Sequence, residues 1–341
     1  MNIAIVGCGA IAKVHGDSVE KSAGHRLVAF ADRIKERAEQ FATRYQGTAY
    51  ESLEEMLERE AIDVLHICTP HDLHVPMAIY ALEHGVHVFM EKPPVISLEQ
   101  LQQLEAVQSD RYLGFCFQNR YNPSILQVKK LLESGEAGKI YGARGIVNWS
   151  RPDSYYTNSE WRGRLSTEGG GVLINQSVHT MDLIAYFLGT PLSVDAMMAN
   201  HHLKNVIEVE DTMEAYIRFK GERRACFYAT TAYVDNMPPI IEIACEDRTI
   251  RIEDLNVTYY YKDAKVERPP IKSKEGLGKD YWGGGHQDCI EDFYQSIERK
   301  VPFALDLPNI KETILLMLGM YESAKTGQEI AITYFKEDVL C

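Results

Sequence analysis

The stretch that decides the fold is IAIVGCGAIAKVH, which runs from Ile3 to His15. A short apolar run leads into Gly7-x-Gly9-x-x-Ala12, and a helical pattern follows. Glycine at position 7 allows a tight turn, glycine at position 9 lets a pyrophosphate approach the backbone, and the small Ala12 lets the helix pack closely on the strand. The phosphates would lie at the positive end of that helix. The stretch therefore predicts a dinucleotide-binding site.

The next strand-like run ends at Asp32, 20 residues after Ala12. An acidic residue at this place accepts hydrogen bonds from the adenosine ribose and repels a 2′-phosphate, which favours NAD over NADP. The neighbouring Arg33 keeps NADP possible, because a guanidinium can bind the extra phosphate. Glycines between a strand and a helix are also common as plain turns. The strand, turn, helix and acidic residue together favour cofactor binding.

Up to about residue 120, short apolar runs alternate with helical patterns, as in parallel α/β proteins. The predicted strands are 2–7, 26–32, 63–69, 86–91 and 112–117. Beyond this point, strand-like runs joined by short turns predict a largely antiparallel sheet. We therefore expect an α/β protein with a dinucleotide-binding domain at 1–120 and a second α/β domain at 121–341.

Composition narrows the possible functions. The chain has 341 residues, and 49 acidic against 36 basic residues give a formal net charge of -13, which disfavours a nucleic-acid partner. The seven cysteines are widely spaced and odd in number, as expected of reduced thiols. No apolar run approaches the length of a membrane span, and no basic leader is seen. We expect a cytoplasmic protein without a membrane partner.

Two predicted strands end in polar residues, in ICTPHDLH (67–74) and FMEKPP (89–94). Ligands of doubly wound sheets bind beyond the carboxyl ends of the strands. We therefore expect five residues beside the cofactor: Thr69, Pro70, His74, Glu91 and Lys92. A lysine in a partly desolvated cleft can hold an ammonium against an alkoxide or lose its proton near neutral pH. The alternative is an ordinary ion pair at a strand end, which is common at protein surfaces.

A polar stripe lies on an otherwise apolar helical stretch, EGGGVLINQSVHTMDLIAYFLG (168–189). At 100° per residue its polar side chains share a narrow arc: Asn175, His179, Asp182 and Tyr186. His179 could deprotonate a substrate hydroxyl while Lys92 stabilises the developing alkoxide. Asn175 can orient a hydroxyl but cannot exchange protons at neutral pH. A core histidine bonded to Asp182 is the alternative.

Metal binding is not expected. His71 and His74 stand three apart and His201 and His202 are adjacent, but neither pair has convergent carboxylate or cysteine companions.

Taken in order, the motifs resemble the glucose-fructose oxidoreductase, inositol dehydrogenase and MocA (Gfo/Idh/MocA) family of nicotinamide-dependent sugar and polyol oxidoreductases. The matching stretches are GCGAIAKVH, TPHDLH, HVFMEKPP, YYTNSEWRG, GGGVLINQSVHTMD and GGGHQDCIEDFYQSI. They span nearly the whole chain. The resemblance implies a Rossmann domain followed by an α/β domain whose open sheet often forms dimer or tetramer contacts.

Within this resemblance, Lys92 matches the lysine of the family's E-K-P motif, whose peptide bond to proline is often cis. His179 matches the catalytic histidine after the triple glycine. Asn175 departs from members that have an aspartate there, which shifts the acid-base work toward His179 and Lys92.

Other matches are less specific. Trp161 and Arg162 resemble the segment that approaches the nicotinamide and the substrate, although such a pair could equally be a packing contact. His286, after Gly283 to Gly285, would reach the cleft from the C-terminal side, or else is a residue of a loop or helix start.

The main hypothesis is an NAD(P)-dependent dehydrogenase that acts on a secondary hydroxyl of a sugar, inositol or sugar derivative. The side chains expected to bind the substrate are Tyr155, Tyr156, Arg162, Asn175, His179 and His286, together with Lys92. One alternative is an enzyme that keeps a tightly bound NAD and recycles it. The other is a non-catalytic NAD(P) sensor. The resemblance also implies a homodimer or homotetramer formed through the C-terminal sheet.

Overall fold

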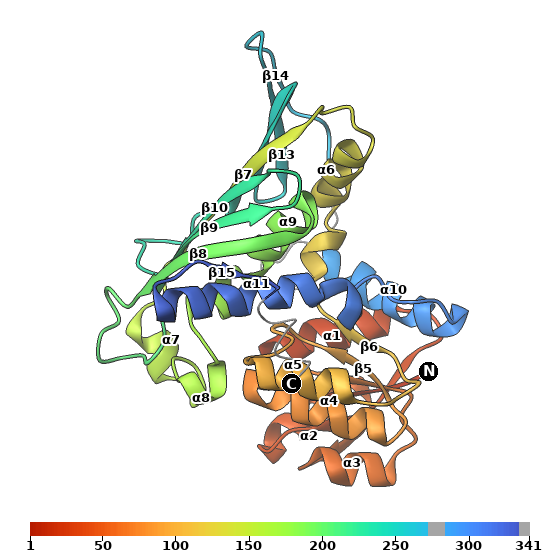
Figure 1. The fold of residues 1–341 in the computed structure, drawn as a ribbon. Coiled ribbons are helices and arrows are strands. Elements are labelled where there is room, and N and C mark those ends of the chain that lie inside the picture. Colours follow the sequence, from red (N-terminus) through yellow and green to blue (C-terminus); the bar gives the residue numbers. More distant parts are fainter. Residues whose placement is uncertain (272–283, 334–341) are drawn as a thin grey trace. The chain divides into compact units, whose positions relative to one another are not determined.

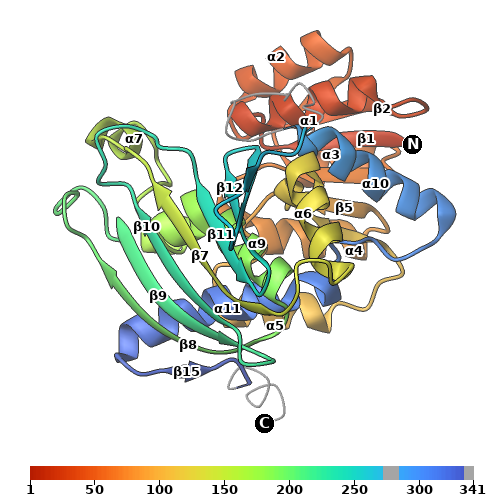
Figure 2. The same ribbon diagram turned by 90° about the horizontal axis from the view of Figure 1, so that it is seen from above.

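The computed structural model describes residues 1–271 and 284–333, which form two compact units (Figures 1 and 2). The first unit comprises 1–121 and 284–310, and the second comprises 122–271 and 311–333. Gly283 of the late glycine motif, the rest of 272–283, and 334–341 lie outside the described residues.

A six-stranded parallel sheet forms the centre of the first unit, in the order β3-β2-β1-β4-β5-β6. Its strands are β1 (Asn2–Val6), β2 (Arg26–Ala31), β3 (Thr48–Tyr50), β4 (Val64–Ile67), β5 (His87–Met90) and β6 (Leu113–Phe115). The strands are largely buried, as expected when helices cover both faces. The order reverses between β1 and β4, which is where such sheets bind ligands. The predicted Rossmann domain is confirmed, and β3 is a short strand that the sequence analysis did not predict.

Helices surround this sheet. They are α1 (Ala10–Lys21), α2 (Lys35–Tyr45), α3 (Leu53–Arg59), α4 (His74–Glu83), α5 (Leu98–Ala106) and α10 (Gly285–Arg299), with short 3₁₀ turns η1 (His71–Leu73) and η2 (Gln118–Tyr121).

Helix α10 follows all but the last strand of the second unit's sheet in sequence but packs in the first unit, beside α1 (Figure 2). The ring of Phe293 lies 5.2 Å from that of Phe89 on β5, and both side chains are fully buried. The change in sequence pattern near residue 120 predicts that 284–310 belong to the second domain. The structure places them with the first because the apolar face of α10 completes the first unit's core.

The second unit contains a nine-stranded sheet in the order β14-β13-β12-β11-β7-β10-β9-β8-β15. Its strands are β7 (Ile140–Asn148), β8 (Pro191–Ala199), β9 (Thr212–Phe219), β10 (Arg224–Thr230), β11 (Ile240–Cys245), β12 (Arg248–Glu253), β13 (Asn256–Tyr261), β14 (Val266–Glu267) and β15 (Ile330–Ala331). All neighbours are antiparallel except β7 and β10. The predicted large, mostly antiparallel sheet is confirmed.

The helical segments of this unit are α6 (Pro123–Glu133), α7 (Asp153–Thr157), α8 (Leu165–Glu168), η3 (Val172–Ser177), α9 (Val178–Leu188) and α11 (Leu307–Thr326), whose first turn belongs to the first unit. Segment η3 is a π-helix, so the helical stretch expected between the triple glycine and Gly189 begins with a π-helix and continues as the α-helix α9. Helix α9 packs closely on β7, where a Cβ added at Gly145 would lie 2.6 Å from Ile184. Within 1–271 and 284–333, no helix has the length and apolarity needed to cross a membrane.

Candidate active site

The two glycines after β1 have different environments. Gly7 has φ +85°, and a Cβ there would lie 2.7 Å from the carbonyl group of Cys68, so the turn excludes any side chain. A Cβ at Gly9 would meet nothing within 4 Å. Helix α1 begins at the next residue. The backbone at Gly9 is therefore open to a pyrophosphate at the helix N-terminus, as the dinucleotide prediction requires.

Asp32 follows β2 and is 8% exposed. Its Oδ2 accepts a hydrogen bond from the Cys8 amide, and its Oδ1 accepts one from the Ile34 amide, both at 2.8 Å. Each carboxylate oxygen has a further lone pair that can accept a hydrogen bond from a ribose hydroxyl. The adjacent Arg33 is exposed.

The loops after β4 and β5 are joined by His74. Its Nδ1 lies 2.9 Å from the carbonyl oxygen of Pro93, and its Nε2 lies 3.0 Å from that of Thr69. The Thr69 hydroxyl is buried and has no hydrogen-bond partner among the described residues. Pro70 opens η1. A buried hydroxyl beside the Gly7 turn is a group that a bound dinucleotide could satisfy.

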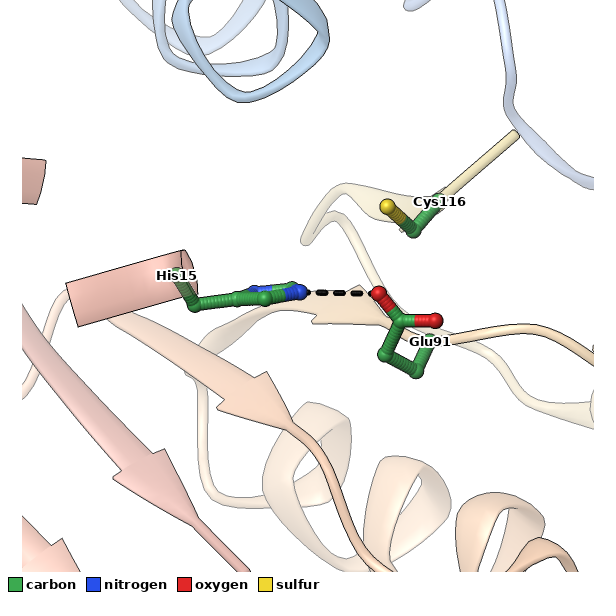
Figure 3. Close-up of side chains that lie close together, drawn as sticks. All are labelled: His15, Glu91 and Cys116. Atoms are coloured by element: carbon green, nitrogen blue, oxygen red, sulfur yellow. Dashed lines mark hydrogen bonds and ion pairs between the residues drawn. The ribbon is translucent and has the colours of Figure 1, made fainter. Parts of the chain in front are cut away.

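Lys92 follows β5, is partly exposed, and forms a cis peptide bond with Pro93. Its backbone amide donates to Oε2 of Glu91 at 3.2 Å. Glu91 is buried, and its Oε1 lies 2.9 Å from Nε2 of His15 on α1 (Figure 3). The strand-end carboxylate is therefore bonded to a histidine inside the unit.

Burial alone would raise the pKa of Glu91, but the hydrogen bond and charge of His15 outweigh it and hold that pKa well below its usual range. Burial alone would lower the pKa of His15, whereas hydrogen bonds with Cys116 and Glu91 raise it to about 9. The pair is thus an imidazolium and a carboxylate at neutral pH. Cys116 completes a group whose three ligand-type atoms lie within 4.8 Å of one another (Figure 3).

The buried polar chain continues beyond His15. Its Nδ1 lies 2.8 Å from Nδ1 of His66 on β4, and Nε2 of His66 lies 2.7 Å from the hydroxyl of Tyr294 on α10. His286 is 2% exposed, and its ring lies 6.5 Å from that of His15. Burial lowers the pKa of His286 to about 4. The structure thus places His286 in the interior of the first unit. His15 and His66 were not among the predicted site residues, because their partners are remote in sequence.

Segments η3 and α9 carry the predicted polar stripe. Within 172–188 only Asn175, His179 and Tyr186 are partly exposed, and every other residue is buried. Asp182 belongs to the buried set and accepts a hydrogen bond from the Thr313 hydroxyl at 2.7 Å.

The ring of Tyr186 is covered by the ammonium of Lys129, 4.4 Å from its centroid. This contact leaves Asn175 and His179 as the stripe's two candidate groups for chemistry.

Glu168, at the end of α8, is fully buried and was missed by the sequence analysis. It accepts hydrogen bonds from the Gly163 amide and from the side-chain amide of Asn175. Burial, together with the charge of Glu210, raises its pKa to about 7 despite these bonds and Arg162. No regular sequence pattern pointed to it, because its donors, Gly163 and Asn175, lie five residues before it and seven after it.

Glu210 holds the triple-glycine segment. It accepts hydrogen bonds from the amides of Gly171 and Leu173, at 2.8 and 3.0 Å, and from the hydroxyl of Tyr321 at 2.9 Å.

The guanidinium of Arg162 lies 4.6 Å from the Tyr155 ring centroid and 4.9 Å from that of Trp161. Tyr155, Trp161 and Arg162 are all partly exposed. Tyr156 is 3% exposed and packs in an apolar cluster with Leu203, Ile207 and Val209. Its surroundings favour packing over the expected contact with a substrate.

The paired histidines have local partners. His71 and His74 lie with ring centroids 5.7 Å apart. The amides of His201 and His202 and Nδ1 of His202 all lie 2.8 Å from Oδ2 of Asp211.

Comparison with known proteins identifies the family. Residues 1–111 match the model of the oxidoreductase family with an NAD-binding Rossmann fold, and 125–251 match the GFO/IDH/MocA C-terminal domain. D-glucoside 3-dehydrogenase from Escherichia coli is 30% identical over 357 residues, covering 97% of each chain. The scyllo-inositol 2-dehydrogenase (NAD(+)) of Bacillus subtilis is 30% identical over 198 residues, 56% of this chain and 54% of the relative.

Among solved structures, the WlbA dehydrogenase from Bordetella pertussis, in complex with NADH and UDP-GlcNAcA, is 27% identical with a TM-score of 0.84. The match covers 97% of this chain and 98% of that one. The open backbone at Gly9, the acidic residue after β2 and the matched domains agree with one another. The chain belongs to the Gfo/Idh/MocA family of oxidoreductases and has its NAD-binding Rossmann domain.

Proposed function

We propose that this NAD-binding oxidoreductase oxidises a secondary hydroxyl of a sugar, inositol or sugar derivative to a ketone, or catalyses the reverse reduction. The observation that carries the proposal is the pair of partly exposed polar residues, Asn175 and His179, on a helical stretch in which Tyr186 is the only other residue that is not buried. Relatives of this chain are named as a glucoside dehydrogenase and inositol dehydrogenases, which supports the substrate class.

The proposed chemistry divides between the two units. His179 takes the proton of the substrate hydroxyl, because imidazole exchanges protons near neutral pH. Lys92 presents an ammonium that stabilises the developing alkoxide. Bound NAD supplies the acceptor for the hydride. Asn175 orients the hydroxyl through its side-chain amide.

The remaining polar residues serve binding in this proposal. Thr69, Pro70, His74 and Glu91 line or brace the nucleotide site, and Arg162 with Tyr155 binds substrate hydroxyls. Trp161 contributes an aromatic surface next to the nicotinamide. Asp32 favours NAD, and the exposed Arg33 leaves some capacity for NADP.

We also propose a homodimer or homotetramer formed through the uncovered face of the nine-stranded sheet. The strand registers place Met197, Tyr216, Tyr228 and Tyr260 on this face, and all are exposed. The ion pairs of Glu242 with Arg144 and Arg251 lie among them. Light scattering should report the oligomer, and Met197→Glu with Tyr228→Glu should dissociate it.

The deciding experiment follows NADH absorbance at 340 nm with NAD or NADP and a panel of methyl glucosides, inositols, uronates and nucleotide sugars. Turnover with one class would support the proposal and name the substrate. His179→Gln should abolish that turnover while leaving NADH binding intact. Cofactor that stays bound through purification, with no net NADH formed, would replace the proposal by the recycled-cofactor enzyme. Binding of NADH without turnover on the whole panel, in protein purified free of cofactor, would favour the sensor.

A further inference from the structure

Glu168 is a buried, titratable side chain to which the proposed mechanism gives no role. Both of its carboxylate oxygens are engaged, one by the Gly163 amide and the other by the side-chain amide nitrogen of Asn175. Because Asn175 is partly exposed and Glu168 is fully buried, the carboxylate lies on the protein side of the amide.

This arrangement decides which end of the Asn175 amide faces outward. An ionised carboxylate only accepts hydrogen bonds, so a neighbouring amide must turn its NH₂ toward it. The carbonyl oxygen Oδ1 is then directed away from the carboxylate, and as an amide oxygen it can accept hydrogen bonds. A protonated carboxyl could instead donate to Oδ1 and allow the reverse orientation. The protonation state of Glu168 therefore selects between an acceptor and a donor at position 175.

We propose that Glu168, in its ionised form, is a positioning residue that holds the carbonyl oxygen of Asn175 toward the hydroxyl of the substrate. The inference rests on the proposed function, in which Asn175 orients that hydroxyl.

The surroundings of Glu168 favour a carboxyl that changes protonation near neutral pH. The ionisable groups that act on it include Glu210, Arg162, Tyr156 and Tyr321. Burial and the charge of Glu210 raise its pKa to about 7, while the Gly163 and Asn175 hydrogen bonds and Arg162 limit the rise. Burial also raises the pKa of Glu210, against its backbone and Tyr321 hydrogen bonds.

Exchanging the carboxyl group of position 168 with the amide group of position 175 tests the proposal by kinetics. Glu168→Gln removes the charge, and Asn175→Asp places two carboxyls against each other. Each should lower kcat/KM about 10- to 100-fold, the range of one hydrogen bond to a charged group. In the variant that carries both changes, the new amide at position 168 can donate to the carboxylate at position 175 and accept from Gly163. This double variant should recover to within about threefold of wild type, a coupling that only directly interacting residues show.

The assay uses methyl glucoside or scyllo-inositol, whichever wild type oxidises, and each variant's melting temperature is measured beside it. Rescue in the double variant at unchanged melting temperature supports positioning, because a purely structural role would move stability and activity together. A double variant no more active than Asn175→Asp would overturn the proposal.

A second measurement needs no turnover and separates this inference from the proposed function. The side-chain NH₂ resonances of Asn175 in ¹⁵N-labelled protein, assigned by their absence in Asn175→Asp, should shift with pH with a midpoint near the pKa of Glu168. Glu168→Gln should remove that titration. Resonances that are constant between pH 5 and 9 in wild type would overturn the inference, even if the enzyme is active. A clear titration in a protein that oxidises no sugar would retain the hydrogen-bond switch and reject the substrate role.

Discussion

Glu91 and Glu168 are both buried glutamates, one in each unit, and each adjoins a candidate catalytic residue. Their pKa values move in opposite directions. His15 contributes a positive charge and a hydrogen bond to Glu91 and lowers its pKa, whereas Glu168 has amide donors and the like-charged Glu210 nearby, and its pKa rises. Burial raises the pKa of both groups, so the partner decides the sign of the shift.

The difference in pKa separates a carboxylate that stays ionised, Glu91, from a carboxyl group that titrates, Glu168. The Glu91 carboxylate stays ionised throughout the physiological range and fixes the backbone before Lys92. Glu168 changes its charge within that range. Groups whose environments push their pKa values apart are typical of active sites. The environments of Glu91 and Glu168 can therefore be compared by the same isosteric substitution, glutamate to glutamine, at each position.

The largest effect on activity is expected at Lys92, which directly follows the buried Glu91 in the first unit. Lys92→Ala removes the proposed alkoxide-stabilising ammonium but leaves the His15–Glu91 pair in place. We expect kcat/KM to fall about 10⁴-fold, which is about 5 kcal/mol, because positioned proton and charge stabilisation is lost. NADH affinity, followed by fluorescence, and the melting temperature should stay close to wild type. Activity equal to wild type would remove Lys92 from the mechanism.

A smaller effect, on stability, is expected from the ion pair itself. Glu91→Gln leaves an imidazolium buried without its anion, which costs about 3–5 kcal/mol of unfolding free energy. Urea unfolding at pH 7 measures this loss. Adding His15→Gln should restore part of the stability, since an amide pair carries no uncompensated charge. If the single variant unfolds like wild type, the two groups are not an ion pair in solution.

The pH dependence of unfolding sharpens the comparison further. The folded pKa of Glu91 is depressed, so its contribution is present above the unfolded pKa near 4.5 and is lost as pH falls through the folded value. The pKa of His15 is raised to about 9, so its contribution is complete below about 6.5 and is lost as pH rises through 9.

The contribution of Glu168 to stability changes with pH in the opposite direction from that of Glu91. Its folded pKa, about 7 against 4.5, gives a contribution that is complete below 4.5 and is lost between 4.5 and 7. The loss is about 3 kcal/mol, from about 1.4 kcal/mol per pH unit. Glu168→Gln should remove this decline, whereas Glu91→Gln should leave it in place. Identical pH profiles of stability in the two variants would contradict the assigned environments.

The smallest effect concerns a third buried carboxylate, Asp32, which accepts hydrogen bonds from two backbone amides. Asp32→Ala should weaken NAD binding by about 1–2 kcal/mol and narrow the difference in affinity between NAD and NADP. Isothermal titration calorimetry with NAD and NADP measures these affinities, and Arg33→Ala serves as the control variant at the neighbouring position. An unchanged preference in Asp32→Ala, with a changed one in Arg33→Ala, would assign the selectivity to Arg33.

The parts of the fold that local patterns determine could be predicted from the sequence. The β1–α1 turn, five of the six parallel strands and the antiparallel character of the second sheet follow from short-range periodicity. Strand β3, with three residues, is too short to show a period. The placement of α10 depends on contacts with residues far away in sequence, such as Phe89, which no local pattern contains.

The site was predictable to a similar extent. Asn175 and His179 stand out because polar residues interrupt an apolar helix, although the assumed 100° per residue fails in η3, which is a π-helix. His66 and Glu91, which bond His15, are 51 and 76 residues away from it, and Tyr294 is 228 residues away from His66. Their pairing, and therefore the pKa of Glu91, becomes visible only in three dimensions.

Helix α10 has a consequence for synthesis on the ribosome. The sheet of the first unit is complete at Phe115, but Phe293, which packs on Phe89, and Tyr294, which bonds His66, are translated after eight of the nine strands of the second sheet. Until α10 is translated, the core of the nascent first unit lacks these two side chains, and the uncovered apolar surface favours association. For the same reason, a fragment ending at residue 121 is a poor substitute for the intact nucleotide-binding unit.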